Sequence, residues 1–544
     1  MYKTTGEIVV ETLVNLGAKY IFGIPGVHSV ELYRGLKGKR LKHITPRHEQ
    51  GAGFMADGYA RKSGSPGVCF VITGPGLTNI ITPIAQAYAD RVPILVISAV
   101  NPTPELGNNT GLLHSLPDQT ALIKTVAIKS YTIKRPSEAA KIIAQSYFET
   151  LGPRKGPVVV QIPTDVLEKK ILGSHQRNIE HKTKVMPVKK SDLLKCTKLI
   201  RNENKIIILA GGGAKHASSE IIELSETLSA PVVLTINARG MMQNHPMVIP
   251  ASPSLPKVRK FLEYYDLAII VGSEVGSTDY NMFGTEKPIV FKKIIRVDLD
   301  PKPNANFPKI TLNITQDAKA FIQHLNLYLL EKKINKSKNW ATSKNLVAHA
   351  KKEAKKSLTL SDKKMISLLN RIYQSAPSSV IVGDSTKPVY AGNNFLEAPA
   401  PNTWFNAATG FGALGYATPA SIGAKIAEPK SQIICLIGDG GFQFSMSEIG
   451  TAYDQNLDII YLIWNNFGYK EIADFMQIKK IKKIGVTPYP PNHKKIADAY
   501  SMPYFLLERL SDTQSILDKA KILMRKGRNK PCMIEVIEKS FIYD

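Results

Sequence analysis

Short runs rich in Ile, Val and Leu, each followed at once by Gly, Asn, Asp or Thr, recur along this chain. Runs of this length and composition are typical of parallel strands that are buried on both faces and end in polar loops. The segments between them are long enough for the crossover helices that parallel strands require. The alternation predicts an α/β protein built from doubly wound parallel sheets.

The chain has 544 residues, more than one hydrophobic core usually organises, so several domains are expected. A polar, basic stretch at 174–190 and a lysine-rich stretch at 331–356 interrupt the alternation of strands and helices. Both are predicted to link domains, and the second is interpreted as a solvated helix rather than as a contact site for anions. We therefore expect three domains, at 1–173, 191–330 and 357–544.

The composition excludes several classes of protein. Hydrophobic residues make up 43% of the chain, which supports large cores, and no apolar run reaches the length of a membrane span or a signal peptide. The four cysteines are widely separated, which favours buried side chains in a cytoplasmic protein over disulfides or a zinc site. The net charge of +26 comes from lysines spread along the chain without a nucleic-acid-binding motif, so it indicates a solvated surface.

Two apolar runs in the last domain are each followed by polar residues that could bind a metal ion. The run at 433–437 leads into Gly-Asp-Gly-Gly, and the run at 459–464 leads into Asn-Asn-Phe-Gly-Tyr. Ligands bind beyond the carboxyl ends of such strands, so Asp439 and Asn466 are expected at one site. A carboxylate, an amide oxygen and a carbonyl freed by a glycine turn suit Mg²⁺, which takes phosphate or water as its other ligands.

This pair of loops resembles the signature of thiamine diphosphate enzymes, in which Gly-Asp-Gly is followed, after a strand–helix–strand interval, by Asn-Asn. The resemblance implies that Asp439, Asn466 and the carbonyl of Gly468 hold Mg²⁺ on the diphosphate of the cofactor. It also implies that the neighbouring loop residues line the cofactor site, namely Gly438, Gly440, Gly441 and Tyr469.

The first domain carries a second series of motifs that resembles the pyrimidine-binding domain of the same family. They are Phe-Gly-Ile-Pro-Gly at 22–26, Met-Ala-Asp-Gly-Tyr-Ala-Arg at 55–61 and Thr-Gly-Pro-Gly-Leu-Thr-Asn at 73–79, with a strand ending in His-Glu before the second. The resemblance implies that Glu49 is the catalytic glutamate, which bonds to N1′ and lets the 4′-amino group act as the base toward C2. A buried site that raises the pKa of a carboxyl group would suit this role.

Further residues complete the expected cofactor site. Ser385 and Thr386 follow an apolar run and offer hydroxyl groups suited to phosphate. By resemblance, the carbonyl of Gly412 would accept a hydrogen bond from the 4′-amino group, and Leu414 would hold the cofactor in its bent shape.

The substrate pocket is predicted from the loop at 101–119, which in related decarboxylases carries histidines that face the substrate. His114 matches one of them, and a histidine can relay protons because it titrates near neutral pH. Val27 and His28, after the first Pro-Gly turn, are further candidates for this pocket.

The central segment resembles the middle domain of the family, which holds FAD in acetolactate synthases. The arginines expected after the strand are absent from the corresponding segment at 273–280. The glycine turn at 211–213 also departs from Gly-x-Gly-x-x-Gly, the pattern of dinucleotide sites. Both observations put FAD in doubt.

The resemblance implies non-oxidative decarboxylation of a 2-oxo acid through an enamine on the cofactor. Protonation of the enamine would release an aldehyde, whereas attack on a second 2-oxo acid would make this an acetolactate synthase-like carboligase. A binding protein without catalysis is a third alternative, which the presence of Glu49, Asp439 and Asn466 disfavours.

Segments at 23–28, 46–50 and 466–472 are most similar to the 5-guanidino-2-oxopentanoate (2-ketoarginine) decarboxylases. A cationic substrate tail would require a carboxylate in the pocket, which Glu471 or Asp474 would supply. The family also implies a homodimer, or a dimer of dimers, in which Glu49 of one subunit reaches the cofactor bound by the last domain of another.

Overall fold

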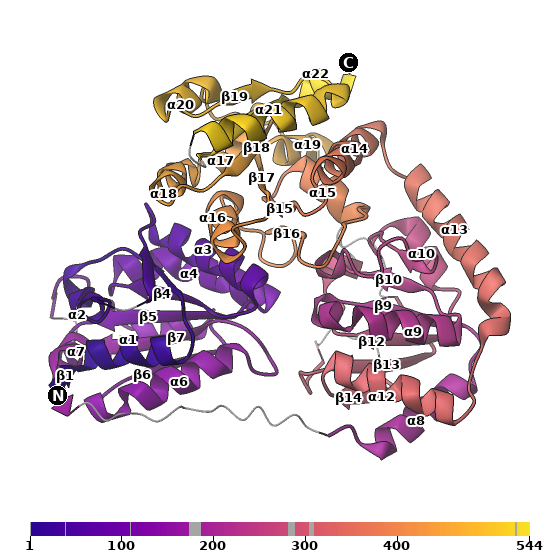
Figure 1. The fold of residues 1–544 in the computed structure, drawn as a ribbon, viewed down its shortest axis with the longest axis horizontal. Coiled ribbons are helices and arrows are strands. Elements are labelled where there is room, and N and C mark those ends of the chain that lie inside the picture. The colour runs from indigo at the N-terminus through magenta and orange to yellow at the C-terminus, as the bar shows by residue number, and fades with distance from the viewer. Residues whose placement is uncertain are drawn as a thin grey trace.

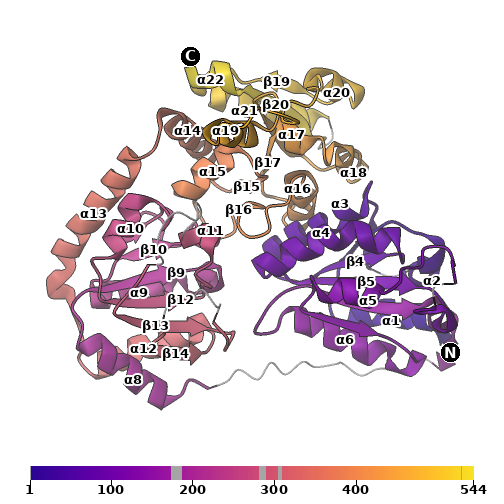
Figure 2. The same ribbon diagram turned by 180° about the vertical axis from the view of Figure 1, so that it is seen from behind.

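The computed structural model describes residues 2–38, 40–108, 110–172, 187–280, 289–303, 309–527 and 530–543. These residues form three six-stranded sheets, each covered by helices, which Figure 1 and Figure 2 show as three bodies that meet near the centre of the molecule. A small antiparallel pair joins β1 (Tyr2–Thr4) to β8 (Lys170–Leu172). The predicted fold class, three parallel-sheet units, is confirmed. Most of the linker predicted at 174–190 lies outside the described residues.

The first sheet has the strand order β3-β2-β4-β5-β7-β6, and all of its pairs are parallel. Its strands are β2 (Tyr20–Gly23), β3 (Lys42–Ile44), β4 (Gly67–Val71), β5 (Ile94–Val100), β6 (Lys129–Thr132) and β7 (Val158–Pro163). Its helices are α1 (Thr5–Asn15), α2 (Val30–Arg34), α3 (Glu49–Ser63), α4 (Pro75–Asp90), α5 (Gln119–Lys124), α6 (Ala139–Thr150) and α7 (Thr164–Glu168). Every residue of β4, β5 and β7 is buried, as expected for a sheet covered on both faces.

The central sheet, also parallel, has the order β11-β10-β9-β12-β13-β14. Its strands are β9 (Ile206–Ala210), β10 (Val232–Leu234), β11 (Val248–Ile249), β12 (Leu267–Val271), β13 (Lys293–Asp298) and β14 (Leu312–Thr315). Its helices are α8 (Lys190–Arg201), α9 (Ser218–Leu228), α10 (Pro256–Leu262), α11 (Ser277–Tyr280) and α12 (Ala318–Glu331).

Helix α13 (Trp340–Lys356) connects the central unit to the third and runs along the outer edge of the molecule (Figure 1). The prediction of a solvated linker is wrong for one side of this helix, because Val347, Ala350 and Ala354 are buried. Their spacing of three and four residues places them on one face, which packs into the shared core of the central and third units.

The third sheet has the order β16-β15-β17-β18-β20-β19 and is parallel throughout. Its strands are β15 (Val380–Gly383), β16 (Trp404–Asn406), β17 (Ile433–Gly438), β18 (Ile459–Asn465), β19 (Tyr504–Leu506) and β20 (Cys532–Ile537). Its helices are α14 (Leu360–Ser375), α15 (Lys387–Asn394), α16 (Ala417–Ala427), α17 (Asp439–Phe442), α18 (Ile449–Asp454), α19 (Lys470–Ile478), α20 (His493–Ala499), α21 (Thr513–Lys526) and α22 (Glu538–Tyr543).

The crossover between β17 and β18 is not a single helix. It consists of α17, a short 3₁₀ turn (Met446–Glu448) and α18. The break follows from a tertiary contact, because the buried side chain of Glu448 accepts hydrogen bonds from the backbone amides of Arg47 at 3.0 Å and His48 at 3.2 Å. The first unit therefore docks where the crossover turns.

Helices α3 and α16 carry the closest packing between the first and third units. A Cβ atom added to Gly58 would lie 2.0 Å from the carbonyl oxygen of Ala420, and one added to Gly423 would lie 1.8 Å from that of Met55. Only glycine permits this approach at either position. The hydroxyl of Tyr416 also donates to Asp57 at 2.5 Å across the interface.

The four cysteines are all free and buried. In the part of the chain that the structure describes, none of the helices combines the length and the apolar character needed to cross a membrane.

Candidate functional site

Asp439 joins the two loops that follow β17 and β18. Its side chain is buried, and its two carboxyl oxygens accept hydrogen bonds from the backbone amides of Asn466 at 3.2 Å and Gly468 at 2.8 Å. These strands are direct neighbours and pair in register from Ile433 with Ile459 onward, so their carboxyl ends coincide. The structure thus brings together the three residues that the sequence predicts as the cation site.

The side chain of Asn466 has a buried acceptor that is free to bind a ligand. Its Nδ2 donates to Glu538 Oε2 at 3.1 Å, whereas its Oδ1 is buried and has no hydrogen-bond partner among the described residues. An unsatisfied buried acceptor destabilises a protein by about 1–3 kcal/mol unless a ligand satisfies it. A hard divalent cation that takes oxygen ligands would do so.

The environment of Asp439 also fits a cation. Burial raises the pKa of this carboxyl group, although the amides of Asn466 and Gly468 act in the opposite direction. No Lys or Arg within the described ranges forms an ion pair with it, and these ranges hold no cluster of three or more His, Cys, Asp or Glu side chains suited to a metal. A cation bound here would have Asp439 as its single carboxylate and would favour the charged form of that group.

Asp384, which the sequence interpretation missed, organises the neighbouring loop. It is fully buried and accepts hydrogen bonds from the amides of Ser385 at 2.8 Å and Ala417 at 3.0 Å. Burial raises its pKa to about 6, and the backbone amides oppose this shift. Thr386 lies against the loop that contains Asp439, since a Cβ atom added to Gly438 would lie 3.0 Å from Thr386 Oγ1. The hydroxyl groups of Ser385 and Thr386 therefore lie at the same sheet edge as Asp439.

Two further glycines keep this edge open. A Cβ on Gly440 would meet the ring of Tyr469 at 2.7 Å, and one on Gly441 would meet Asp384 Oδ1 at 3.0 Å. Larger side chains at either position would push the loops apart. The predicted cofactor residues Gly438, Gly440, Gly441 and Tyr469 thus form one cradle around the cation site.

The segment with Gly412 and Leu414 reaches the same edge from between β16 and α16. Gly412 has φ of 81° and open space beside it, and Leu414 is half-buried. Gly415 fixes the segment, because its Cβ position lies 2.6 Å from Cβ of Phe444, which follows α17. No hydrogen bond in the described chain joins Gly412 or Leu414 to the cation loop.

A buried network behind the cation loop was also missed from the sequence. Glu535 accepts hydrogen bonds from Asn465 at 2.6 Å, His493 at 2.8 Å and Tyr504 at 2.6 Å. Asn465 in turn accepts from the amide of Phe467 at 3.0 Å, which holds Phe467 at φ of 61°. Burial alone would raise the pKa of Glu535, but the three hydrogen bonds outweigh it and lower the pKa to about 2.

Replacing Glu535 by Gln is expected to reduce stability in a pH-dependent way. The lowering of the Glu535 pKa from 4.5 to about 2 corresponds to a contribution of roughly 3 kcal/mol to the free energy of unfolding. As the pH falls, the unfolded chain binds the proton first, so this stabilisation is present above pH 4.5 and is lost on the way to pH 2. Urea unfolding of both proteins across this range is the measurement, and identical pH dependence would contradict the role of Glu535.

Glu49 begins helix α3 in the first unit. Asn79, the last residue of the Thr-Gly-Pro-Gly-Leu-Thr-Asn motif, donates to Glu49 Oε2 at 3.0 Å. Gly76 of the same motif leaves room beside it, since a Cβ there would lie 3.7 Å from Oε1. Glu49 is half-buried, so part of its carboxyl group is open to a ligand.

His28 and His114 face each other near the same loop, with ring centroids 5.2 Å apart. Both Nδ1 atoms are buried and unpartnered in the described chain, as is Oδ1 of Asn101, a residue that the sequence interpretation did not select. Burial, and then the neighbouring His114, lower the pKa of His28, while Asn101 acts in the opposite direction. These polar atoms are available to a ligand, and Val27, which precedes His28 in the chain, has 83% of its surface exposed.

The residues around Glu49 and the residues around Asp439 are not in direct contact through hydrogen bonds or ion pairs among the described residues of one chain. In the residues that the structure covers, no hydrogen bond or ion pair links Glu49 or His114 to the loops that hold Asp439 and Asn466. Each group lies at the carboxyl edge of its own sheet.

The two acids proposed for a cationic substrate differ in their surroundings. Asp474 forms ion pairs with Lys470 and, at 3.5 Å, with Lys387. Glu471, in the first turn of α19, is exposed and has no ion pair among the described residues. Of the two, only Glu471 has a carboxylate that is free to bind a cation.

The carboxyl edge of the central sheet receives an arginine from the first unit. Arg91, just after α4, forms ion pairs with Glu274, with Asp298 at 3.7 Å and with Asp300 at 3.2 Å. The segment at 273–280 itself has no arginine, and the arginine that pairs with these acids comes from a domain distant in the sequence.

Comparisons with known proteins agree with this architecture. Family models of the thiamine pyrophosphate (TPP) enzymes match the chain in three places: the N-terminal TPP binding domain at 3–122, the central domain at 193–325 and the C-terminal TPP binding domain at 384–536. The two TPP binding domains contain the Glu49 and Asp439 groups, respectively.

Several proteins are similar over nearly the whole chain. A probable 2-ketoarginine decarboxylase from Pseudomonas aeruginosa is 36% identical over 501 residues, which cover 91% of this chain and 88% of that protein. An acetolactate synthase large subunit from Buchnera aphidicola is 30% identical, covering 85% and 81%. A probable acetolactate synthase large subunit from Methanocaldococcus jannaschii is 27% identical, covering 98% and 91%. The chain therefore belongs to the thiamine pyrophosphate enzyme family.

Proposed function

We propose that this chain decarboxylates a 2-oxo acid without oxidation, using thiamine diphosphate held by Mg²⁺. The observation that carries the proposal is the cation loop, where Asp439 is fixed by two backbone amides and the buried Asn466 Oδ1 lacks a partner. The similarity to a probable 2-ketoarginine decarboxylase over 91% of the chain supports the choice of a decarboxylase.

Each part of the chain has a distinct task in this proposal. Asp439, Asn466 and the carbonyl of Gly468 would hold Mg²⁺, and the hydroxyl groups of Ser385 and Thr386 would receive the diphosphate. Bound thiamine diphosphate supplies the carbanion chemistry that releases CO₂. Glu49 would exchange a proton at its carboxyl oxygen, with Asn79 holding that group in place.

His28 and His114 would relay protons to and from the substrate. Their rings face each other, and the lowered pKa of His28 keeps it neutral at neutral pH, so it can accept a proton there. Asn101 would orient the substrate through its unpartnered Oδ1. We further propose that the chain, with domains at 1–173, 191–330 and 357–544, acts as a homodimer or a dimer of dimers, in which Glu49 of one subunit would reach the cofactor bound by the last domain of another. The cytoplasm is its proposed location.

The substrate that we favour is 5-guanidino-2-oxopentanoate. Its guanidinium group needs a carboxylate without a competing partner, which Glu471 offers and Asp474 does not. Arginine-type cations bind carboxylates through charge-assisted, bidentate hydrogen bonds. Glu471 lies in the first turn of the helix that follows the cation loop, close in sequence to Gly468 and Tyr469.

Replacing Glu471 by Gln is expected to reduce the preference for the guanidino acid over an aliphatic 2-oxo acid by about tenfold, as loss of one charged contact implies. The ratio of kcat/KM values for the two substrates measures this preference. Asp474→Asn is the matched control, because it removes one charge from the same helix but from a group already paired with lysines. An unchanged ratio in Glu471→Gln would reject this substrate.

A carboligase is the second candidate, because two relatives that cover most of the chain are named acetolactate synthases. Purified protein with thiamine diphosphate, Mg²⁺ and a panel of 2-oxo acids distinguishes the two reactions. Aldehydes as the main products support the decarboxylase, whereas acyloins or acetohydroxy acids support the carboligase. The absence of both products would leave only a binding role.

FAD is not part of the proposal. The acids at the carboxyl edge of the central sheet, Glu274, Asp298 and Asp300, are paired with Arg91 from the first unit. This cluster places a bridge of side chains where a dinucleotide would lie in an open α/β sheet. The absorption spectrum of the purified protein reports any flavin directly.

A further inference from the structure

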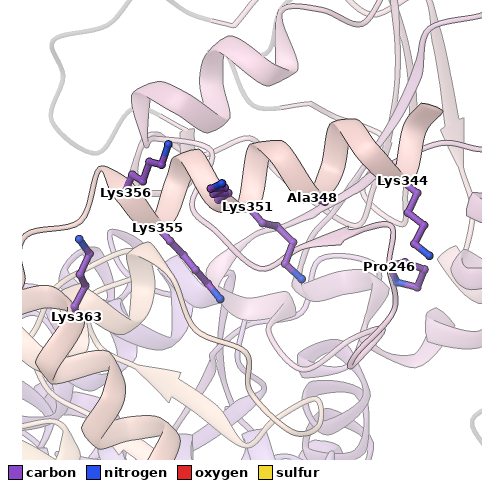
Figure 3. A pocket seen from close by; sticks show the side chains of 8 residues that line it. Pro246, Lys344, Ala348, Lys351, Lys355, Lys356 and Lys363 are labelled. Atoms are coloured by element: carbon purple, nitrogen blue, oxygen red, sulfur yellow. The ribbon is translucent and has the colours of Figure 1, made fainter. Parts of the chain in front are cut away.

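We propose that a lysine-lined cleft between α13 and α14, remote in the fold from the cation loop, binds a small ligand with several phosphate groups. The cleft has a volume of about 630 Å³ and is shown in Figure 3. The six lysines that line it are Lys344, Lys351, Lys352, Lys355, Lys356 and Lys363.

Helix α13 carries five of these six lysines, all except Lys363. An adjacent face of the helix holds it in place, because Val347, Ala350 and Ala354 on that face pack into the core. Positions 344, 348, 351 and 355 are three or four residues apart, so they form one stripe along the helix. Position 348 is an alanine, and its short side chain leaves space in the middle of the stripe (Figure 3).

The cleft carries an excess of positive charge. Lys351 and Lys355 share one acid, Glu397, at 3.6 and 4.0 Å, and Lys356 pairs with Glu353. Lys344, Lys352 and Lys363 have no acidic partner within the described ranges. Six cationic groups therefore face two carboxylates, and a multivalent anion would relieve their mutual repulsion.

The dimensions and lining favour a small polyphosphate over a macromolecule. A volume of about 630 Å³ lies within the range of small-molecule sites, roughly 300–1,000 Å³. The lining residues include neither an aromatic ring on which bases would stack nor an arginine for bidentate contacts. Lysines bind phosphate as point charges, and several in a row suit a chain of phosphates.

One end of the cleft is less polar. Pro246 from the central unit lies there, beside the side chain of Lys344 (Figure 3). This end would receive the organic part of a nucleoside triphosphate. Lys363 lies on α14, at the start of the third unit, so a bound ligand would bridge the central unit, the connecting helix and the third unit.

The test uses the full-length protein saturated with thiamine diphosphate and Mg²⁺, so that added phosphates cannot enter the cofactor site. Calorimetric titration with ATP and, separately, with inorganic tripolyphosphate at low ionic strength is expected to show one site per chain. The triple variant Lys344→Gln, Lys352→Gln, Lys363→Gln removes the three unpaired lysines and is expected to weaken binding by about tenfold or more.

The matched control is Lys124→Gln, Lys134→Gln, Lys141→Gln, which removes three exposed lysines of the first unit that have no acidic partner in the described chain. Binding by the control is expected to equal that of the unaltered protein. Decarboxylase activity, or the thermal unfolding midpoint without phosphate, verifies that both variants are folded. The ligand is also expected to raise that midpoint in the unaltered protein and in the control but not in the cleft variant.

Tighter binding of ATP than of tripolyphosphate would support the proposal with the nucleoside in contact, and equal binding would support recognition of the phosphate chain alone. Absence of binding by both probes would overturn it. So would equal weakening in the two triple variants, since that indicates a general effect of net charge. A short RNA or poly-glutamate that binds through the same lysines while ATP does not would also reject a small-molecule site.

Discussion

Replacing Glu49 by Gln is expected to lower kcat by about 10²- to 10⁴-fold, the usual contribution of a positioned acid–base group. Glutamine has the same size, and its side-chain oxygen can still accept the hydrogen bond that Asn79 donates at 3.0 Å. The amide cannot exchange a proton, however, so the step that needs this proton should slow while the packing around α3 stays intact. The affinity for thiamine diphosphate should change little, because Glu49 contributes no ligand to the cation loop.

Two measurements test this role separately. Isothermal titration gives the affinity for the cofactor, and hydrogen–deuterium exchange at C2 of the bound cofactor, followed by NMR, gives the rate of proton removal. Glu138→Gln is the control, because it removes a carboxylate of the same domain that pairs with exposed Arg135. Exchange in Glu49→Gln as fast as in the unaltered protein would show that Glu49 is not the catalytic glutamate.

The strands were predictable because the signal for each one lies in the composition of its own short stretch of sequence. A strand buried on both faces must be apolar along its whole length, as Ile433–Gly438 and Ile459–Asn465 nearly are. The polar residues that follow then fall at one edge of the sheet. This reasoning places Asp439 beside Asn466, and the structure adds that the link runs through backbone amides to both carboxyl oxygens.

Supporting residues were missed because their partners are distant in sequence. Glu535 meets Asn465 only because β20 pairs with β18, an adjacency that no local pattern indicates. Glu538 likewise reaches Asn466 from the end of β20. Asp384 had a detectable signal, since it follows the glycine that ends β15 just as Asp439 follows the glycine that ends β17.

Helix α13 shows how composition can hide packing. Its lysines dominate the sequence, and the residues that anchor it are small and few, so a solvated helix was the simpler interpretation. The buried face becomes evident only at helical spacing. Because that face is packed in the core, the lysines on the adjacent face are held in place as well, and they line one side of a cleft.

Asp439→Ala should weaken the binding of thiamine diphosphate by about 100-fold or more and should remove its dependence on Mg²⁺, because the loop then has no carboxylate for the cation. The substitution also removes the acceptor that holds the amides of Asn466 and Gly468, so the two loops would lose their mutual register. Titration of the cofactor with Mg²⁺ and with EDTA measures both effects.

Loss of stability and loss of the cation site must be separated for this result to be decisive. Asp279→Ala provides the comparison. The buried carboxyl group of Asp279 also accepts a hydrogen bond from a backbone amide, that of Ile236 at 2.9 Å, but Asp279 lies in the central unit. Burial raises the pKa of Asp279 to about 6, so it resembles Asp439 in being a carboxyl group held in a poorly solvated site. If removal of Asp279 weakened cofactor binding as much as removal of Asp439, general destabilisation would explain both, and Asp439 would lose its place as the cation ligand. Normal cofactor affinity in Asp279→Ala together with Mg²⁺-independent, weak binding in Asp439→Ala would tie the diphosphate to the loop between β17 and β18.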